Sequence, residues 1–139
     1  MSQENVEVAR AFQVAFNQRD RAAITRLTHA DFEFIPMLAT LEGHVYRGHA
    51  ELLGWIDSLD EDWETFELCP EEYHDLGGSV LCLGHWHARG RTSGIEFEGQ
   101  PGAWLVSVRE GRLSRSETFT DRAEALAAAA LSGQAPRSN

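Results

Sequence analysis

Three side chains have types and spacing that suit proton transfer: Glu33, His85 and His87. Glu33 lies in residues 31–36, where polar and apolar residues alternate, so on a strand it shares a face with Ile35. A carboxylate buried among aromatic rings has a raised pKa and can act as a general acid or base. We therefore predict Glu33 as a catalytic residue; the alternatives are a structural ion pair with an arginine or an exposed strand end.

His85 and His87 lie two residues apart, so both imidazoles point to one face of an extended strand. Such a pair could assist proton transfer or bind a metal ion. No third ligand is evident nearby, so no metal site is predicted, and both histidines are catalytic candidates. The alternative is that they lie on the surface or in a dimer interface.

The tryptophans Trp55, Trp86 and Trp104 could form an aromatic wall for a flat apolar ligand, or they could be ordinary core residues. Trp63 lies within residues 57–75, which hold nine carboxylates and no arginine. This segment lacks the oxygen spacing and turn glycine of a cation loop, so we expect a solvated face with Trp63 in a structural role.

Cys69 and Cys82 lie thirteen positions apart, with no second pair and no metal-binding spacing. We expect free thiols rather than a disulfide. A nucleophilic role for Cys82 would need a positive neighbour that lowers its pKa, and the sequence around it offers none.

Apolar periodicity and turn residues predict an α+β chain. Val8, Phe12 and Phe16 recur at helical spacing, and Asp20 can cap a short second helix. The expected helices are residues 4–18, a short helix after Asp20, 49–59 and 121–131. The expected strands are residues 31–36, 64–69, 79–91, 95–98, 103–109 and 112–120.

This order of elements resembles the SnoaL-like family of the nuclear-transport-factor-two-like, or ketosteroid-isomerase-like, superfamily. The residues that carry the resemblance are Ala11-Phe12, Phe16-Asn17-Gln18-Arg19-Asp20, His29-Ala30-Asp31-Phe32-Glu33-Phe34, Tyr46-Arg47-Gly48-His49, Thr92-Ser93-Gly94-Ile95-Glu96, Trp104-Leu105-Val106, Glu110-Gly111-Arg112-Leu113 and Asp121-Arg122-Ala123-Glu124-Ala125-Leu126. The resemblance implies one domain over residues 1–131, followed by a frayed tail over residues 132–139.

For the fold, the resemblance implies a bent antiparallel or mixed sheet that forms a cone around the N-terminal helix, a cystatin-like α+β barrel with an apolar pocket. It also implies a homodimer formed through the open sheet face. Strand alternation with this resemblance turns His85, His87, Arg89, Arg115 and Glu117 outward. The expected ligand-contacting residues are Phe12, Phe16, Ile35, Trp55, Trp86, Trp104, Ser116 and Thr118.

Ketosteroid isomerases of this superfamily use an aspartate base, with a tyrosine and a second aspartate that hold the oxyanion. At the matching positions this chain has Ile35, Phe12 and Trp104. All three polar groups are absent, so ketosteroid isomerase activity is not expected.

The composition of the chain limits the classes of molecule that it is expected to bind. The formal net charge is −10, which disfavours nucleic acid, because phosphate binding needs a positive surface. The chain has no lysine, which excludes a lysine Schiff base and a Walker-type phosphate loop. No apolar stretch is long enough to cross a membrane, and the N-terminal residues do not resemble a signal peptide, so we expect a cytoplasmic protein.

Three functions fit these observations. The first is an enzyme without a cofactor that transfers protons on an apolar carbonyl compound, as an isomerase, cyclase, dehydratase or hydrolase. The second is a non-catalytic module that binds an apolar small molecule or dimerises. The third is a protein-interaction domain that uses its open sheet face, although charged residues there resemble a homodimer seam more than an oily partner surface.

Overall fold

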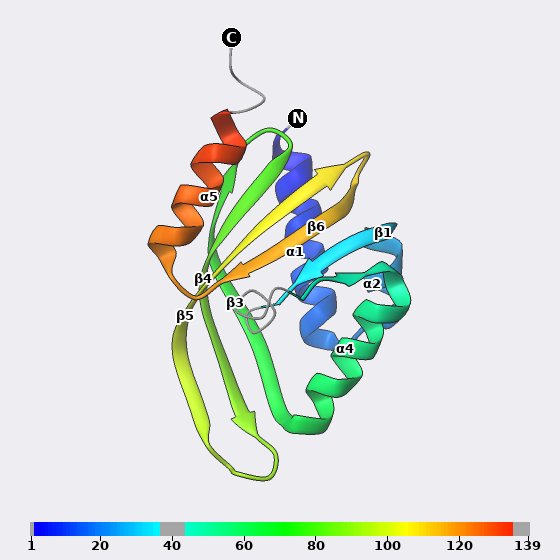
Figure 1. Ribbon diagram of the computed structural model, residues 1–139, viewed down its shortest axis with the longest axis vertical. Coiled ribbons are helices and arrows are strands. Elements are labelled where there is room, and N and C mark those ends of the chain that lie inside the picture. Colours follow the sequence, from blue (N-terminus) through cyan, green and yellow to red (C-terminus); the bar gives the residue numbers. More distant parts are fainter. Residues whose placement is uncertain (1, 37–43, 135–139) are drawn as a thin grey trace.

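The computed structural model describes residues 2–36 and 44–134. The chain begins with two helices and ends with a run of four strands and a last helix, an arrangement typical of an α+β chain (Figure 1). They are α1 (Ser2–Gln18), α2 (Arg21–Leu27), β1 (Thr28–Ile35), β2 (Tyr46–Arg47), α4 (Gly48–Asp62), β3 (Trp63–Asp75), β4 (Ser79–Gly90), β5 (Glu96–Arg109), β6 (Arg112–Phe119) and α5 (Arg122–Gln134).

The strands form one curved sheet in the order β2-β1-β6-β5-β4-β3. β1 and β6 run parallel, while every other neighbouring pair is antiparallel. The mixed sheet and the helices give the α+β cone that the sequence predicted. The long strands β3, β4 and β5 bend away from the short strands, and this curvature leaves room for a hollow on the concave side.

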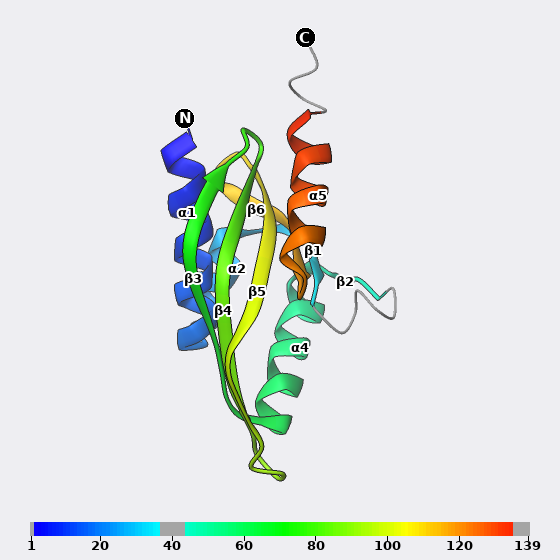
Figure 2. The same ribbon diagram turned by 90° about the vertical axis from the view of Figure 1, so that its left-hand side faces the viewer.

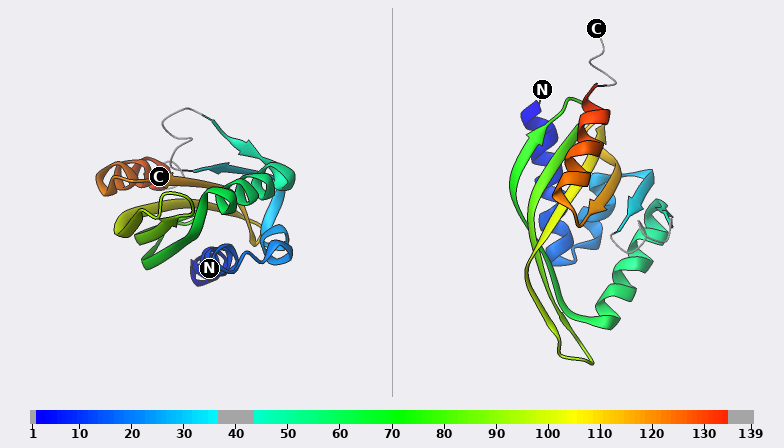
Figure 3. Two further views of the ribbon diagram at one scale, coloured as in Figure 1. Left: turned by 90° about the horizontal axis from the view of Figure 1, so that it is seen from below. Right: turned by 60° about the vertical axis from the view of Figure 1, so that its left-hand side comes forward.

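The two faces of the sheet have different covers. The concave face packs on α1, α2 and α4, where Phe12, Phe32 and Ile56 belong to one buried cluster. On the other face, α5 lays Ala125 and Ala129 against a second cluster that includes Phe119. Figure 2 shows α1 and α5 on opposite sides of the strands, and Figure 3 shows the same layers from below.

The N-terminal helices form for local reasons that the sequence shows. Phe12 and Phe16 are one turn apart on α1, and both are buried. Asp20 caps α2, because its Oδ1 accepts a hydrogen bond from the backbone N–H of Ala23 over 3.1 Å. Asn17 then fixes α1 to the sheet, since its amide exchanges two hydrogen bonds with the backbone of Leu68.

Several strand boundaries differ from the prediction, most of all those of β5 and β3. Residues 95–98 and 103–109 belong to one strand, β5, because the chain keeps pairing with β4 across the glycines between them. Gly99 has φ +57°, which a residue with a side chain rarely adopts, so the strand bends there without ending. β3 is also longer than residues 64–69, since it pairs with β4 from Trp63 to Asp75.

At the C-terminal end, α5 continues to Gln134, three residues beyond the predicted end of the helix at Leu131. The rest of the predicted tail, residues 135–139, lies outside the described part of the chain. Within residues 2–36 and 44–134, no helix is both long enough and apolar enough to cross a membrane.

Candidate functional site

A cavity of about 500 Å³ lies on the concave side of the sheet, between α1, α4 and the long strands. Most of its wall is aromatic or aliphatic. The lining residues are Phe12, Gln13, Phe16, Phe34, Pro36, His44, Tyr46, Trp55, Ser58, Leu59, Asp62, Trp63, Phe66, Leu68, Trp86, Phe97, Trp104, Val106, Ser116 and Thr118. This volume is in the range of small-molecule sites.

Buried polar groups hold one part of the wall. Gln13 is only 3% exposed, and its Oε1 accepts a hydrogen bond of 2.8 Å from the Tyr73 hydroxyl. The thiol of Cys82 is buried as well. Burial raises the pKa of Tyr73 to about 12 and that of Cys82 to about 12. Both groups are therefore neutral at ordinary pH, and the Tyr73 hydroxyl orients Gln13.

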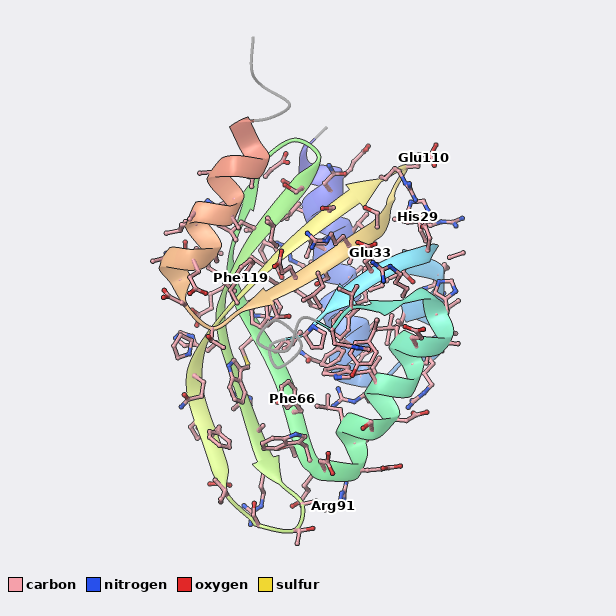
Figure 4. All side chains as sticks on the ribbon, in the orientation of Figure 1. His29, Glu33, Phe66, Arg91, Glu110 and Phe119 are labelled. Carbon is pink, nitrogen blue, oxygen red and sulfur yellow. The ribbon has the colours of Figure 1, made fainter. Side chains whose placement is uncertain are left out.

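Four half-buried rings form a closed circuit in another part of the wall: Trp63, Phe66, Trp86 and Phe97. Phe66 stacks on Trp86 with centroids 5.4 Å apart and planes at 14°. The other three neighbouring pairs have centroids 5.7 to 5.8 Å apart. Figure 4 labels Phe66 on β3, near the turn where α4 ends. Together these rings offer a broad π surface to a ligand.

Among the described residues, the titratable side chains that line the cavity are His44, Tyr46 and Asp62. The rings of His44 and Tyr46 meet edge to face with centroids 4.3 Å apart. Asp62 is the last residue of α4, and it is the only carboxylate among the described residues of the wall. An imidazole and a carboxylate can both exchange protons with a bound molecule.

Of the eight residues expected to contact a ligand, seven line the cavity. They are Phe12, Phe16, Trp55, Trp86, Trp104, Ser116 and Thr118. Ile35 does not, because the side chains of β1 point to the sheet faces opposite to those expected. Phe34 pairs with Ser116 and lines the cavity, whereas Ile35 pairs with Glu117 and is buried on the other face.

For the same reason Glu33 points out of the cavity, contrary to the prediction from sequence. Its carboxylate lies 3.3 Å from Nε of Arg47 and 3.5 Å from Nε of Arg115, and 37% of the side chain is exposed. Figure 4 shows Glu33 on β1. This is the structural ion pair that the sequence left as the alternative, and the expected burial among aromatic rings is absent.

His85 and His87 also point away from the cavity, toward the outer face of the sheet. His85 Nδ1 lies 3.2 Å from Glu71, and His87 Nε2 lies 3.1 Å from Glu67. His87 also lies within 3.8 Å of the Cys69 thiol. Within the described ranges, no three His, Cys, Asp or Glu side chains gather closely enough to hold a metal ion.

The acidic segment contributes more to the wall than the sequence suggested. Trp63 and Asp62 both line the cavity, although residues 57–75 were expected to be a solvated face with Trp63 in a structural role. Asp62 was missed because helix α4 was expected to end at Leu59, three residues too early. The signal that could have found it is the aromatic residue that follows it in the chain.

Comparisons with known proteins agree with this architecture. The profile of the SnoaL-like domain family matches residues 8–116. An NTF2-like protein of Burkholderia xenovorans superposes with a TM-score of 0.73 at 26% identity, over 93% of this chain and 97% of that one.

Two further solved structures share the fold. A hypothetical protein of Catenulispora acidiphila with a ketosteroid isomerase-like fold, solved with trimethylamine, has a TM-score of 0.72 at 18% identity, over 89% of this chain and 92% of that one. A putative polyketide cyclase of Xanthomonas campestris has a TM-score of 0.72 at 18% identity, over 92% and 98%. No curated protein matches the chain closely enough to count as a relative.

Proposed function

The chain belongs to the SnoaL-like domain family, and from this premise we propose that its cavity binds a flat, largely apolar small organic molecule. The aromatic wall of the cavity of about 500 Å³ carries the proposal. A flat molecule that enters it loses apolar surface to water and stacks on the rings of the wall, and both effects favour binding. The trimethylamine in the Catenulispora neighbour agrees with a site for small organic molecules in this fold.

The polar groups of the wall would orient the ligand. Gln13 is fixed by Tyr73, and the hydroxyl groups of Ser116 and Thr118 come from one face of β6. A few placed polar groups in a mostly apolar wall are typical of sites that select a ligand by its oxygen or nitrogen atoms. We propose that these groups select among flat ligands.

A second candidate function is proton transfer on an apolar carbonyl compound, without a cofactor. The observation that favours it is that His44 and Asp62 both line the cavity. In this scheme one of them takes a proton from the carbon next to the carbonyl, which leaves an enolate, and returns a proton to that carbon. Glu33, His85 and His87 have no part in this scheme, because none of them lines the cavity.

A thermal-shift titration with 2-acetonaphthone, a flat aromatic ketone, tests binding. We expect a concentration-dependent rise in Tm for the wild type. Ser58→Phe should abolish the rise, because Ser58 is an exposed residue of α4 that lines the cavity. Ala50→Phe is the matched control, since Ala50 is exposed on the same helix and does not line it. An equal rise in both variants, or none in the wild type with any flat aromatic compound, would overturn the proposal.

Proton transfer has its own test. In D₂O, proton NMR follows the methyl signal of 2-acetonaphthone, which disappears as enolisation exchanges its protons for deuterium. We expect exchange above the protein-free rate, and a loss in Asp62→Asn or His44→Gln but not in Glu61→Gln, whose side chain does not line the cavity. If exchange stays at the protein-free rate while 2-acetonaphthone still binds, the protein is a binding module and the proton-transfer function is wrong.

A further inference from the structure

The charges around the cavity are distributed unevenly. All twelve basic residues of the chain are arginines, and none of the described ones lines the cavity. Asp62, an exposed residue at the end of α4, is the one carboxylate in the described wall, and it has no ion-pair partner among the described residues. A cavity with this wall attracts a positive charge and repels a negative one.

Arg91 hydrogen bonds to the backbone around Asp62, and no ion pair joins it to the Asp62 carboxylate in the described part of the chain. Its guanidinium donates hydrogen bonds to the backbone carbonyls of Asp60 and Trp63, over 2.9 Å and 3.2 Å. Its backbone N–H donates to the Asp62 carbonyl over 2.9 Å. Figure 4 labels Arg91 beside this turn. Arg91 therefore fixes the turn that carries Asp62 and leaves the carboxylate available.

The aromatic circuit adds a second attraction for cations. Trp63 follows Asp62 directly, and it contacts both Phe66 and Phe97 in the circuit. The faces of tryptophan and phenylalanine rings are electron-rich and attract alkylammonium groups, with tryptophan the strongest. Four such rings beside an unpaired carboxylate combine the two features that recognise an organic cation.

We propose that the ligand of this cavity is a cation: an aromatic or aliphatic amine whose substituted ammonium group lies against Trp63, Phe66, Trp86 and Phe97 and is balanced by Asp62. The proposal rests on the proposed function, because it assigns a charge to the molecule that the cavity binds. Asp62 is then the residue that determines specificity. The apolar part of the ligand extends toward Phe12 and Trp104.

Three probes of similar shape and different charge test the proposal: phenyltrimethylammonium, the neutral tert-butylbenzene and the anionic benzenesulfonate. The four tryptophans of the chain all line the cavity, so intrinsic fluorescence reports occupancy. We expect the cation to bind about tenfold more tightly than the neutral probe at low salt, and the anion not to bind. Added NaCl should weaken the binding of the cationic probe only.

Two variants test whether Asp62 causes the preference for the cationic probe. Asp62→Asn should reduce the preference for the cation to about threefold or less, with unchanged affinity for tert-butylbenzene, because the aromatic rings remain. Glu61→Gln removes the same charge from the neighbouring exposed residue, which does not line the cavity, and should keep the preference.

The outcomes separate this inference from the proposed function. Equal binding of the cationic and neutral probes, or equal effects of the two variants, would overturn the inference and leave the apolar binding site intact. If no probe changes the fluorescence and 2-acetonaphthone gives no thermal shift, the proposed function itself fails.

Discussion

Gln13 lies on α1, and its side chain lines the cavity. It is buried, yet its amide oxygen accepts a hydrogen bond from the hydroxyl of Tyr73. A buried amide without a partner would cost about 1–3 kcal/mol, so this contact keeps Gln13 in one orientation. Desolvation is the main reason why the pKa of Tyr73 is raised, and this has a consequence for stability at high pH.

We predict that the protein loses stability as the pH rises from about 10 to about 12. Burial raises the pKa of Tyr73 from 10.0 to about 12, so between these values the folded state keeps a proton that the unfolded state has released. The stabilisation is complete below pH 10 and is lost as the pH rises through 12. Urea unfolding at several pH values should show this decline. It should be smaller in Tyr73→Phe, and an equal decline would contradict the assignment.

Glu33 gives a prediction opposite to the one that the sequence suggested. Because it bridges Arg47 and Arg115 outside the cavity, Glu33→Gln should leave the affinity for 2-acetonaphthone unchanged. The loss of two partly exposed ion pairs should lower the free energy of unfolding by about 1 kcal/mol or less. Paired fluorescence and urea titrations check both effects. A tenfold loss of affinity with an intact fold would return Glu33 to the site.

At the scale of the elements, β1 shows what the sequence could and could not predict. Alternation correctly separated its two faces, but the match to ketosteroid isomerases placed Ile35 and Glu33 inside. Phe32 and Phe34 occupy the inner face instead, since two large apolar rings gain more from burial than a carboxylate can. The Phe-Glu-Phe pattern itself contained this signal.

The long strands were easier to predict for the same physical reason. On β4 and β5, successive side chains point to alternate faces of the sheet. Trp86 and Trp104 lie on the concave face and line the cavity, as expected. His44 and Tyr46 could not be placed from sequence, because their positions depend on where β2 lies against the sheet. Side chains at element ends depend on tertiary packing more than on local periodicity.

Gly102 lets two tryptophans of the cavity wall approach the backbone of β5 closely. A Cβ atom at this position would lie 2.9 Å from Trp104 and 3.0 Å from Trp86, so the two rings close over the bare backbone. Gly102→Ala should displace them, shift the tryptophan emission and cost about 1–3 kcal/mol of stability. The control is Gly78→Ala, where a Cβ meets nothing within 4 Å. Equal spectra and stabilities in the two variants would contradict this role.

For the whole molecule, the two sheet faces suggest a division of roles. The concave face holds the cavity, and α5 covers part of the outer face through Leu81 and Phe119. Farther along the outer face, polar side-chain contacts with carboxylates run across β3 and β4. They join His85 to Glu71, His87 to Glu67 and Arg89 to Glu64.

We propose that this outer face forms a homodimer, because a second copy related by a two-fold axis would meet the same rows of alternating charge. Sedimentation velocity should then show a dimer. His87→Glu places a second carboxylate beside Glu67 and should shift the population to monomers, because like charges would crowd the seam.

Ala50→Glu, an exposed change on α4, is the control and should stay dimeric. Thermal melts of both variants identify any loss caused by unfolding. If the wild type sediments as a monomer, or if folded His87→Glu remains a dimer, the open face is not the seam. The ligand site should be unaffected, since the described residues of its wall lie on the opposite side of the sheet.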